Sequence, residues 1–322
     1  MQVQVLGSSS GTPTKYRNVS GYAVFRDDLK PWYLVDCGEA TQHQLLHTRL
    51  SLYHLEAIMI THKHGDHCYG LPGLLASAGL SGRTHPLTIV APAEVLEFVG
   101  AALAMSDWNL PFQLQLSTPE TNFEESFSWV SVRSCPLQHR VPSFGYKFTE
   151  TRISRKLDID KLQAQQIASG PHYNRLQRGE DVVCNGQQLL AQSYSYLAWQ
   201  PRVIVVCGDN ETPSCLDPVI NGVHLLVHEA TFLADDLLKV GKHTGHSNVK
   251  RICTYAQEKA IPALLLTHFS ARYLPGEGMQ RLIDEAKEQY ANHLFFAVDG
   301  MIVAVEKSGV ASLQKASFNT VR

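Results

Sequence analysis

The chain has 322 residues, of which 44% are apolar, so it is long enough to bury one large core or two ordinary ones. Its 28 basic and 30 acidic side chains give a net charge of −2 with 15 histidines counted as neutral, which excludes a protein coated in positive charge but leaves room for a local basic patch. No apolar run approaches the roughly 18 residues of a membrane span, and the N-terminus lacks the basic and apolar regions of a signal peptide, so we expect a cytoplasmic protein without membrane contact.

Short apolar runs typical of buried strands alternate with helical patterns along the chain. In the first half we expect one helix at 40–49 and strands at 2–7, 22–25, 32–38, 57–62 and 87–92. In the second half we expect helices at 249–260 and 279–290, and strands at 202–209, 223–232, 263–269, 294–300 and 301–306. The alternation indicates an α/β fold with sheet on both sides of the middle of the chain.

The segment AIMITHKHGDHCYG, residues 57–70, crowds three histidines and one aspartate into six positions. If the strand continues, alternate side chains converge, namely His62, His64 and Asp66, and His67 follows on the turn. A single histidine after a strand is more often a hydrogen-bonded structural residue than a ligand. Four such groups without a cation would compete for few partners, so we predict a site for a zinc-like divalent metal. The seven scattered cysteines include no CxxC pair and suggest neither a disulfide framework nor a cysteine zinc site.

One stretch, residues 149–200, does not follow the alternation. Between residues 147 and 178 the chain has seven basic residues against three acidic ones, a local surplus of four. This pattern is typical of an insertion that projects from the core. On charge alone, an ordinary solvated helix with a Gly-Pro stop explains the stretch as well.

Three further residues occupy places equivalent to the histidine cluster, since each follows an apolar run that should be a buried strand. They are His139, Asp209 and His268. In open α/β sheets the strand ends line the crevice where ligands bind, so residues far apart in sequence can meet there. Each alone is as compatible with a structural role, but their matching positions strengthen the metal hypothesis.

With these residues in this order, the sequence resembles the metallo-β-lactamase superfamily and, within it, the ribonuclease Z family in its short form. The resemblance covers essentially the whole chain. It rests on LGSSSGTPTKYRN, ITHKHGDHCYGLPGLL, PLQHRVPSFGYKF, CGDN, HEATF, KHTGHS and LTHFSARY. The histidine cluster marks only the superfamily, whereas the last three motifs are more specific.

The resemblance implies a single metallo-β-lactamase-like domain over residues 1–322, built as an αββα sandwich with an inserted flexible arm at about 149–200. It also implies a homodimer and two zinc ions per subunit, with manganese or magnesium as substitutes. By analogy, one zinc is held by His62, His64 and His139, the other by Asp66, His67 and His268, and Asp209 bridges them. The implied nucleophile is a metal-bound hydroxide.

The implied substrate is precursor tRNA, cut to leave a tRNA 3′-hydroxyl and a 5′-phosphorylated trailer. Asp66 then orients or deprotonates the water, and the pair Glu229 and His246 protonates the leaving oxygen. His228 and His243 beside them are interpreted as structural or supporting. The arm, with its Gly-Pro motif, grips the tRNA away from the cut. We assign substrate contacts to Arg17, Asn18, Gly170, Pro171, Arg175, Arg178, Ser270 and Arg272.

Two alternatives stay open at this point. A small-molecule or phosphodiester hydrolase of the same fold, of lactonase, thioesterase or arylsulfatase type, would use the same ligands. A non-catalytic RNA-binding protein with a degenerate site is the other, although every expected ligand is present. The serine-rich loop at 8–11 fits either a phosphate-binding nest or a tight turn.

Overall fold

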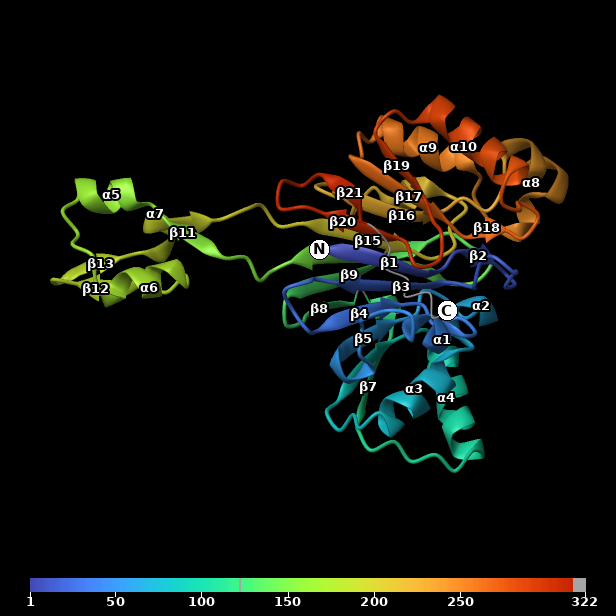
Figure 1. Ribbon diagram of the computed structural model, residues 1–322, viewed down its shortest axis with the longest axis horizontal. Coiled ribbons are helices and arrows are strands. Elements are labelled where there is room, and N and C mark those ends of the chain that lie inside the picture. Colours follow the sequence, from blue (N-terminus) through green and yellow to red (C-terminus); the bar gives the residue numbers. More distant parts are fainter. Residues whose placement is uncertain (122, 315–322) are drawn as a thin grey trace.

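Two β-sheets pack face to face, with helices on the outer side of each sheet (Figure 1). The computed structural model describes residues 1–121 and 123–314. The four-layer α/β sandwich predicted from the sequence is therefore confirmed. An elongated insertion leaves this body and extends well beyond it (Figure 1).

The first sheet has eight strands in the order β21-β20-β1-β3-β4-β5-β6-β7. Strands β4 to β7 run parallel, and β1 pairs antiparallel with β3 and β20. Its strands are β1 Gln2–Gly7, β3 Gly21–Phe25, β4 Trp32–Val35, β5 Leu55–Met59, β6 Leu87–Val90, β7 Leu114–Ser117, β20 Ile302–Val305 and β21 Ala311–Gln314. The helices beside this sheet are α1 Thr41–Leu45, α3 Leu71–Leu80 and α4 Ala93–Met105.

The second sheet has seven strands in the order β19-β17-β16-β15-β10-β9-β8. Strands β15, β16, β17 and β19 run parallel, and the other strands join antiparallel. Its strands are β8 Glu124–Ser126, β9 Val130–Leu137, β10 Ser143–Glu150, β15 Val203–Cys207, β16 Leu225–Glu229, β17 Ala263–Thr267 and β19 His293–Phe296. Beside it lie α8 Ala234–Val240, α9 Val249–Glu258 and α10 Glu277–Gln289 (Figure 1).

Strand β4 shows why the apolar runs are continuous. All four of its residues are buried, with Tyr33 and Val35 in the core between the sheets, and Trp32 and Leu34 in the core under α3 and α4. Successive strand side chains point to opposite faces, so a strand covered on both sides needs apolar residues at every position. This is why the short apolar runs identify the strands well.

The expected elements differ from the observed ones in several places. The helix expected at 40–49 is only α1, Thr41–Leu45. Helices α3 and α4 were not expected, and α3 contains two glycines, which are poor helix formers in water but are accepted where packing stabilises the helix. The shorter elements are β2 Ser9–Ser10, β18 Phe269–Ser270, α2 Gly65–Cys68, η1 Leu52–His54, η2 Pro119–Thr121, η3 Pro213–Leu216 and η4 Lys242–Thr244.

The insertion is a small folded unit rather than a bare loop. It contains β11 Arg155–Leu157, α5 Ile159–Ala164, α6 Pro171–Gln177, β12 Val182–Cys184, β13 Gln187–Leu189, α7 Ala191–Tyr194 and β14 Ser195–Leu197. Leu162, Leu176 and Leu189 are fully buried in its own apolar cluster. The hairpin of β12 and β13 turns at Asn185 and Gly186, both with positive φ, as a two-residue hairpin of this sequence requires. We call residues 151–200 the arm.

The arm is tied to the body at its root, around Glu150 at the end of β10. Both carboxylate oxygens of this buried residue are engaged: Arg202 donates to both, and Arg26 donates to Oε1 at 2.9 Å. The indole Nε1 of Trp199, on the returning segment, donates to Oε2 at 3.1 Å. The two segments that enter and leave the arm are thus fixed to one buried carboxylate.

Candidate active site

The histidine cluster is placed by a loop and a helix, not by a strand. Strand β5 ends at Met59, His64 is the N-cap of α2, and Asp66 and His67 lie within that helix. The prediction that alternating strand positions make these side chains converge is wrong in its geometry. They converge because the chain leaves the sheet and turns at once into α2.

The structure brings all seven predicted ligands together at one edge of the two sheets. The first set is His62, His64 and His139 with Asp209, and the second is Asp66, His67 and His268. Within the first set, His64 Nδ1 lies 3.0 Å from His62 Nε2 and 3.2 Å from His139 Nε2. Ligand atoms bound tetrahedrally to one zinc ion at about 2.05 Å lie about 3.3 Å apart. The spacing therefore suits a metal ion.

The second set has the same spacing. His67 Nε2 and His268 Nε2 are 3.3 Å apart, and each lies 3.4 Å from Asp66 Oδ2. Bare imidazole nitrogens this close to one another cannot all donate or all accept hydrogen bonds. A cation resolves the conflict for both sets.

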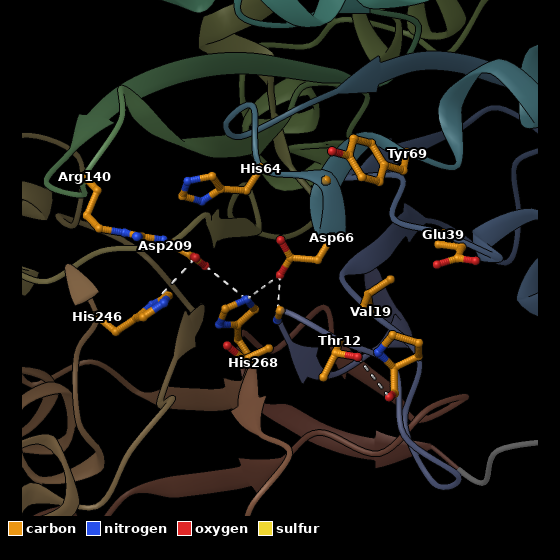
Figure 2. A pocket seen from close by; sticks show the side chains of 14 residues that line it. Thr12, Val19, Glu39, His64, Asp66, Tyr69, Arg140, Asp209, His246 and His268 are labelled. Atoms are coloured by element: carbon orange, nitrogen blue, oxygen red, sulfur yellow. Dashed lines mark hydrogen bonds and ion pairs between the residues drawn. The ribbon is translucent and has the colours of Figure 1, made fainter. Parts of the chain in front are cut away.

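Asp209 lies between the two sets, and each of its oxygens faces one of them. Its Oδ2 lies 3.6 Å from His62 Nε2 and 3.7 Å from His139 Nε2. Its Oδ1 lies 3.6 Å from His67 Nε2 and 3.3 Å from His268 Nε2. This arrangement fits a carboxylate that bridges two metal ions. Figure 2 shows Asp209 between His246 and His268 on the pocket wall.

The outer nitrogens of four of these histidines face oxygen atoms. His67 Nδ1 lies 2.7 Å from Asp36 Oδ2, and His139 Nδ1 lies 2.8 Å from the Gly245 carbonyl. His62 and His268 each place Nδ1 3.1 Å from a threonine hydroxyl. A ring nitrogen that donates to such an oxygen leaves the other nitrogen free as a metal ligand.

Asp36 is a residue of the site that the sequence interpretation missed. It is fully buried, and besides His67 it accepts hydrogen bonds from the backbone N–H and the hydroxyl of Thr61. Asp36 follows strand β4 just as Asp209 follows β15, so the same signal was present. Asp36 and His268 both have positive φ, at 58° and 57°, a costly conformation for non-glycine residues that concentrates at functional sites.

The protonation of the cluster follows from burial and neighbouring charges. Burial lowers the pKa of His64 to about 4, and burial with the adjacent histidines lowers the pKa of His62 well below its usual value. Neutral imidazoles are what metal binding requires. For His67, burial is outweighed by Asp66 and Asp36, which raise its pKa well above the usual value. The carboxylates at this position favour positive charge, which a proton or a metal ion supplies.

Glu229 and His246 meet, as the resemblance implied. His246 Nδ1 lies 3.2 Å from Glu229 Oε1, which also accepts a 2.8 Å hydrogen bond from the Asn210 backbone N–H. Burial alone would lower the pKa of His246, but Glu229 and Asp209 outweigh it and raise that pKa to about 9. The Thr231 hydroxyl donates to the other Glu229 oxygen. His246 is thus held in a charged, oriented state beside the ligand cluster.

The cluster opens into a cavity of about 440 Å³. Besides predicted ligands, its lining includes Glu39, Tyr69 and Arg140, which the sequence interpretation did not select (Figure 2). The serine-rich loop also lines it, through Ser10, Gly11, Thr12 and Pro13. The backbone N–H of Gly11 donates a 2.8 Å hydrogen bond to Asp66 Oδ2. The serine-rich loop therefore orients Asp66, the residue predicted to handle the water.

Two of the expected substrate contacts are turned inward. Arg17 is buried, and its guanidinium donates to the Tyr273 carbonyl and contacts Met279 Sδ at 3.2 Å. The Asn18 side chain is also buried and donates to the Glu39 carbonyl at 2.9 Å. These side chains hold the loop in place, and contact of Arg17 and Asn18 with the substrate stays a prediction.

The remaining expected contacts fall in two places. Ser270 pairs through β18 with β2. Exposed Arg272 places its guanidinium 5.1 Å from the Phe232 ring centre, and the Phe232 ring centre lies 6.1 Å from that of His246. Gly170 and Pro171 begin α6, and Arg175 and Arg178 lie on it or at its end. These four belong to the arm, so the structure does not bring them to the metal cluster.

The arm, residues 151–200, has six basic and four acidic residues, so its positive surplus is two and not the four of the window 147–178, because Glu180 and Asp181 lie beyond that window. Lys147 lies in the body and donates to two backbone carbonyls, and Arg155 donates to Ser195. Arg175 pairs with Glu180 at 3.0 Å, just beyond the window. The exposed basic residues without such a described partner are Arg152, Lys156 and Arg178, while Lys161 donates to the Ser193 carbonyl.

Among the described residues, no helix has the length and apolar character needed to cross a membrane.

A family model described as Anti-Pycsar protein Apyc1 matches residues 1–104. Ribonuclease Z of Pseudomonas putida (strain W619) is 45% identical over 303 residues, covering 93% of this chain and 94% of the relative. Ribonuclease Z of Enterococcus faecalis (strain ATCC 700802 / V583) is 37% identical over 295 residues, covering 91% and 94%.

Two solved structures resemble this fold along almost its full length. The crystal structure of human tRNase Z, short form, matches with a TM-score of 0.66 and 25% identity, covering 95% of this chain and 100% of that one. The metallo-beta-lactamase fold protein YhfI from Bacillus subtilis matches with a TM-score of 0.64 and 19% identity, covering 94% and 98%. The second likeness concerns the fold alone.

Proposed function

The chain belongs to the ribonuclease Z family of endonucleases that process the 3′ end of tRNA, and we propose that it cuts the 3′ trailer from precursor tRNA at a centre of two zinc ions. The products would be a tRNA with a 3′-hydroxyl and a trailer with a 5′-phosphate. The observation that carries the two-metal proposal is Asp209, whose two oxygens each face one ligand set.

The enzyme is metal-dependent, and the donors present fit zinc, because imidazole nitrogens and carboxylate oxygens at this spacing are zinc ligands. We propose His62, His64 and His139 for one ion, Asp66, His67 and His268 for the other, and Asp209 for both. Manganese or magnesium can take their place. When bound, such ions lower the pKa of a shared water and neutralise charge on a phosphate oxygen.

Asp66 is proposed to orient the attacking water or to accept its proton. Its Oδ2 is fixed by the Gly11 N–H and lies 3.4 Å from both His67 and His268. An acceptor fixed by groups that do not move gives the water a defined direction of attack. Burial would raise the pKa of Asp66, but His67 and His268 lower it, which keeps the carboxylate ionised.

His246 is proposed to protonate the ribose 3′ oxygen as it leaves. Its Nδ1 is held by Glu229, so the other ring nitrogen, Nε2, is available to the substrate. The Glu229 carboxylate is itself fixed by Asn210 and Thr231, so the imidazole cannot turn freely. A raised pKa keeps this histidine protonated at neutral pH, as a general acid requires.

The arm is proposed to bind the tRNA away from the cut, with Gly170, Pro171, Arg175 and Arg178 among its contacts. Its projection from the body supports this role, because a contact so far from the centre selects a large substrate (Figure 1). Exposed basic side chains supply affinity for a phosphate backbone without reading sequence. Arg272, whose guanidinium lies over the Phe232 ring that neighbours His246, is proposed to contact the substrate near the cut.

We also propose a homodimer and a cytoplasmic location. Exposed apolar side chains at or near the ends of the helices beside the first sheet support an interface there, namely Leu46, Leu80 and Met105. Sedimentation of the wild type and of a Leu80→Asp variant tests this, since a monomeric wild type would contradict the proposal. Cell fractionation tests the location.

The proposed activity is tested by incubating the pure protein with a precursor tRNA that has a 3′ trailer, with and without chelator. The expected result is a single chelator-sensitive cut after the discriminator base, with a 3′-hydroxyl and a 5′-phosphate. A 2′,3′-cyclic phosphate would show that the neighbouring ribose oxygen attacks instead of water. A protein that stays inactive when zinc or manganese is restored would favour the non-catalytic alternative.

Removing the arm separates the tRNA nuclease from a small-molecule hydrolase. The Ala198 N–H donates to the Ser154 carbonyl at 2.8 Å, so a short Gly-Gly link can replace residues 155–197 without moving the body. We expect this variant to lose tRNA cleavage and to keep hydrolysis of a small phosphodiester. Unchanged tRNA cleavage would contradict the proposed role of the arm.

A further inference from the structure

Tyr69 is an exposed aromatic residue on the wall of the catalytic cavity. It follows α2 directly, three positions after Asp66, and 65% of its surface is accessible to solvent. It lines the same cavity as Asp66, His64 and Asp209 (Figure 2). A scattered surface tyrosine needs no explanation, but this one is fixed beside the ligand cluster.

The Tyr69 ring is held in place by its neighbours. A Cβ atom on Gly65 would lie 2.1 Å from Tyr69 Cε2, so the ring sits directly against the glycine backbone. The Phe98 ring of α4 leans on it, with centroids 5.9 Å apart and planes inclined by 50°. No hydrogen bond links the Tyr69 hydroxyl to any other described residue. The exposed ring is therefore preorganised, and no internal polar contact accounts for its place.

The charges around the cavity differ between its two sides. Exposed Arg140 lies on the side of His64 opposite Tyr69, and the exposed carboxylate of Glu39 lies on the side of Tyr69 (Figure 2). A phosphate backbone is attracted to Arg140 and repelled by Glu39. The side with Tyr69 thus suits an uncharged planar group, and in RNA that group is a nucleobase.

We propose that Tyr69 is a stacking platform for one of the two nucleobases that flank the scissile phosphate. The inference rests on the proposed RNA substrate and adds a base-binding subsite beside the metal cluster. Recognition of unpaired RNA commonly uses a base laid on an aromatic side chain, and such a contact tolerates any base because each has a π face. Tyr69 would then position the nucleotide, so that the phosphate sits over Asp66 and Asp209.

The test pairs changes in the enzyme with changes in the substrate. The kcat/KM of the wild type and of Tyr69→Ala, Tyr69→Leu and Tyr69→Phe is measured on an intact precursor tRNA and on two versions with an abasic nucleotide, one on each side of the cut. A stacked base is worth about 1–3 kcal/mol, so Tyr69→Ala and Tyr69→Leu should lower kcat/KM about 5- to 150-fold on the intact precursor. On one of the two abasic precursors the loss should shrink to less than about 2-fold, and Tyr69→Phe should behave as the wild type.

Equal losses on the intact and both abasic precursors would overturn the proposal, as would full activity of Tyr69→Ala. If the alanine variant does not fold, Tyr69→Leu gives the same decision, because it keeps the bulk and removes the π face. Tyr53→Ala, an exposed tyrosine on η1 outside the cavity, is the matched control and should change nothing. A wild type that does not cut the intact precursor at all would overturn the proposed function and this inference with it. A wild type that cuts with no coupling to the abasic positions would overturn the inference alone.

Discussion

Individual residues show the limits of reading a site from sequence. Asp209 and His268 are recognisable because each ends an apolar run, and the structure brings both to the cluster. Asp36 also ends an apolar run, but it is not a predicted metal ligand, because its carboxylate contacts His67 Nδ1 on the side of the ring away from the ligand cluster. Arg17 belongs to a predicted contact motif, yet its guanidinium is buried. Sequence places residues near a site, but only packing decides which way a side chain faces.

Asp36→Asn should weaken metal binding. The carboxylate holds His67 Nδ1 at 2.7 Å and increases the basicity of the ligand nitrogen, and loss of such a partner typically costs 10- to 100-fold in metal affinity. Competition with a chromophoric chelator measures the effect. Asp217→Asn, an exposed aspartate far along the chain, serves as the control. Unchanged affinity would show that Asp36 only supports the loop of Thr61.

His246→Asn should lower kcat for precursor tRNA by about 10² to 10⁴, because the leaving oxygen loses its proton donor. Metal content should stay at the wild-type level, since His246 is not among the proposed ligands. His243→Asn, an exposed neighbour on η4, should have wild-type activity. The proposed acid role is wrong if a substrate with a good leaving group, which needs no proton, loses as much rate as tRNA does.

Asp299 should make stability depend on pH. It accepts hydrogen bonds from the Ser8 hydroxyl at 2.8 Å and the Asn18 N–H at 2.5 Å, and burial raises its pKa to about 6. The pKa of Asp299 is higher in the folded state than in the unfolded state. Its stabilising contribution to the free energy of unfolding is therefore complete below about pH 4 and is lost as the pH rises through 6.

The free energy of unfolding of the wild type, minus that of Asp299→Asn, should therefore fall by about 1 kcal/mol between pH 5 and pH 7. Denaturant titrations at each pH measure it, and taking the difference removes the titration of all shared groups. The exposed Asp284→Asn change should give a difference that does not vary with pH. A constant difference for Asp299→Asn as well would contradict the raised pKa.

At the scale of elements, the strands were predictable and several helices were not. Runs such as WYLV are apolar at every position because β4 is buried on both faces. The helix α2 is only Gly65–Cys68 and has no periodic pattern, so the segment reads as the end of a strand. The turn into α2 depends on close packing of the Tyr69 ring against Gly65. The helix propensities of the residues in this segment do not predict such a contact.

The root of the arm should depend on Glu150. Its carboxylate is buried with the guanidiniums of Arg26 and Arg202, and removing one partner of a buried ion cluster leaves uncompensated charge. We expect Glu150→Gln to lower the free energy of unfolding by about 3 kcal/mol. Glu180→Gln, which breaks an exposed pair with Arg175 within the arm, should change it by less than about 0.5 kcal/mol. Equal decreases in the free energy of unfolding for the two variants, measured by chemical denaturation, would show that the buried Glu150 ion cluster stabilises the protein no more than an exposed pair does.

At the scale of the whole molecule, the alternation of apolar strands and helices along the sequence predicted the sandwich. The interruption of that alternation at residues 149–200 predicted the arm. The positive surplus of the arm was overestimated because the sequence window ended before Glu180 and Asp181, which both lie in the arm. Convergence of ligands from separate loops follows from parallel strands ending at one edge, as between β15, β16 and β17. The tie of the arm to Glu150 and the place of Tyr69 needed the folded structure.

The proposed function depends most on two metal ions that share Asp209. Crystals soaked in zinc and measured at the zinc absorption edge test this directly, because anomalous scattering locates only the metal. We predict two peaks per chain, one among His62, His64 and His139 on the Oδ2 side of Asp209, and one among Asp66, His67 and His268 on the Oδ1 side. A single peak, or no peak in contact with Asp209, would contradict the proposed two-metal centre.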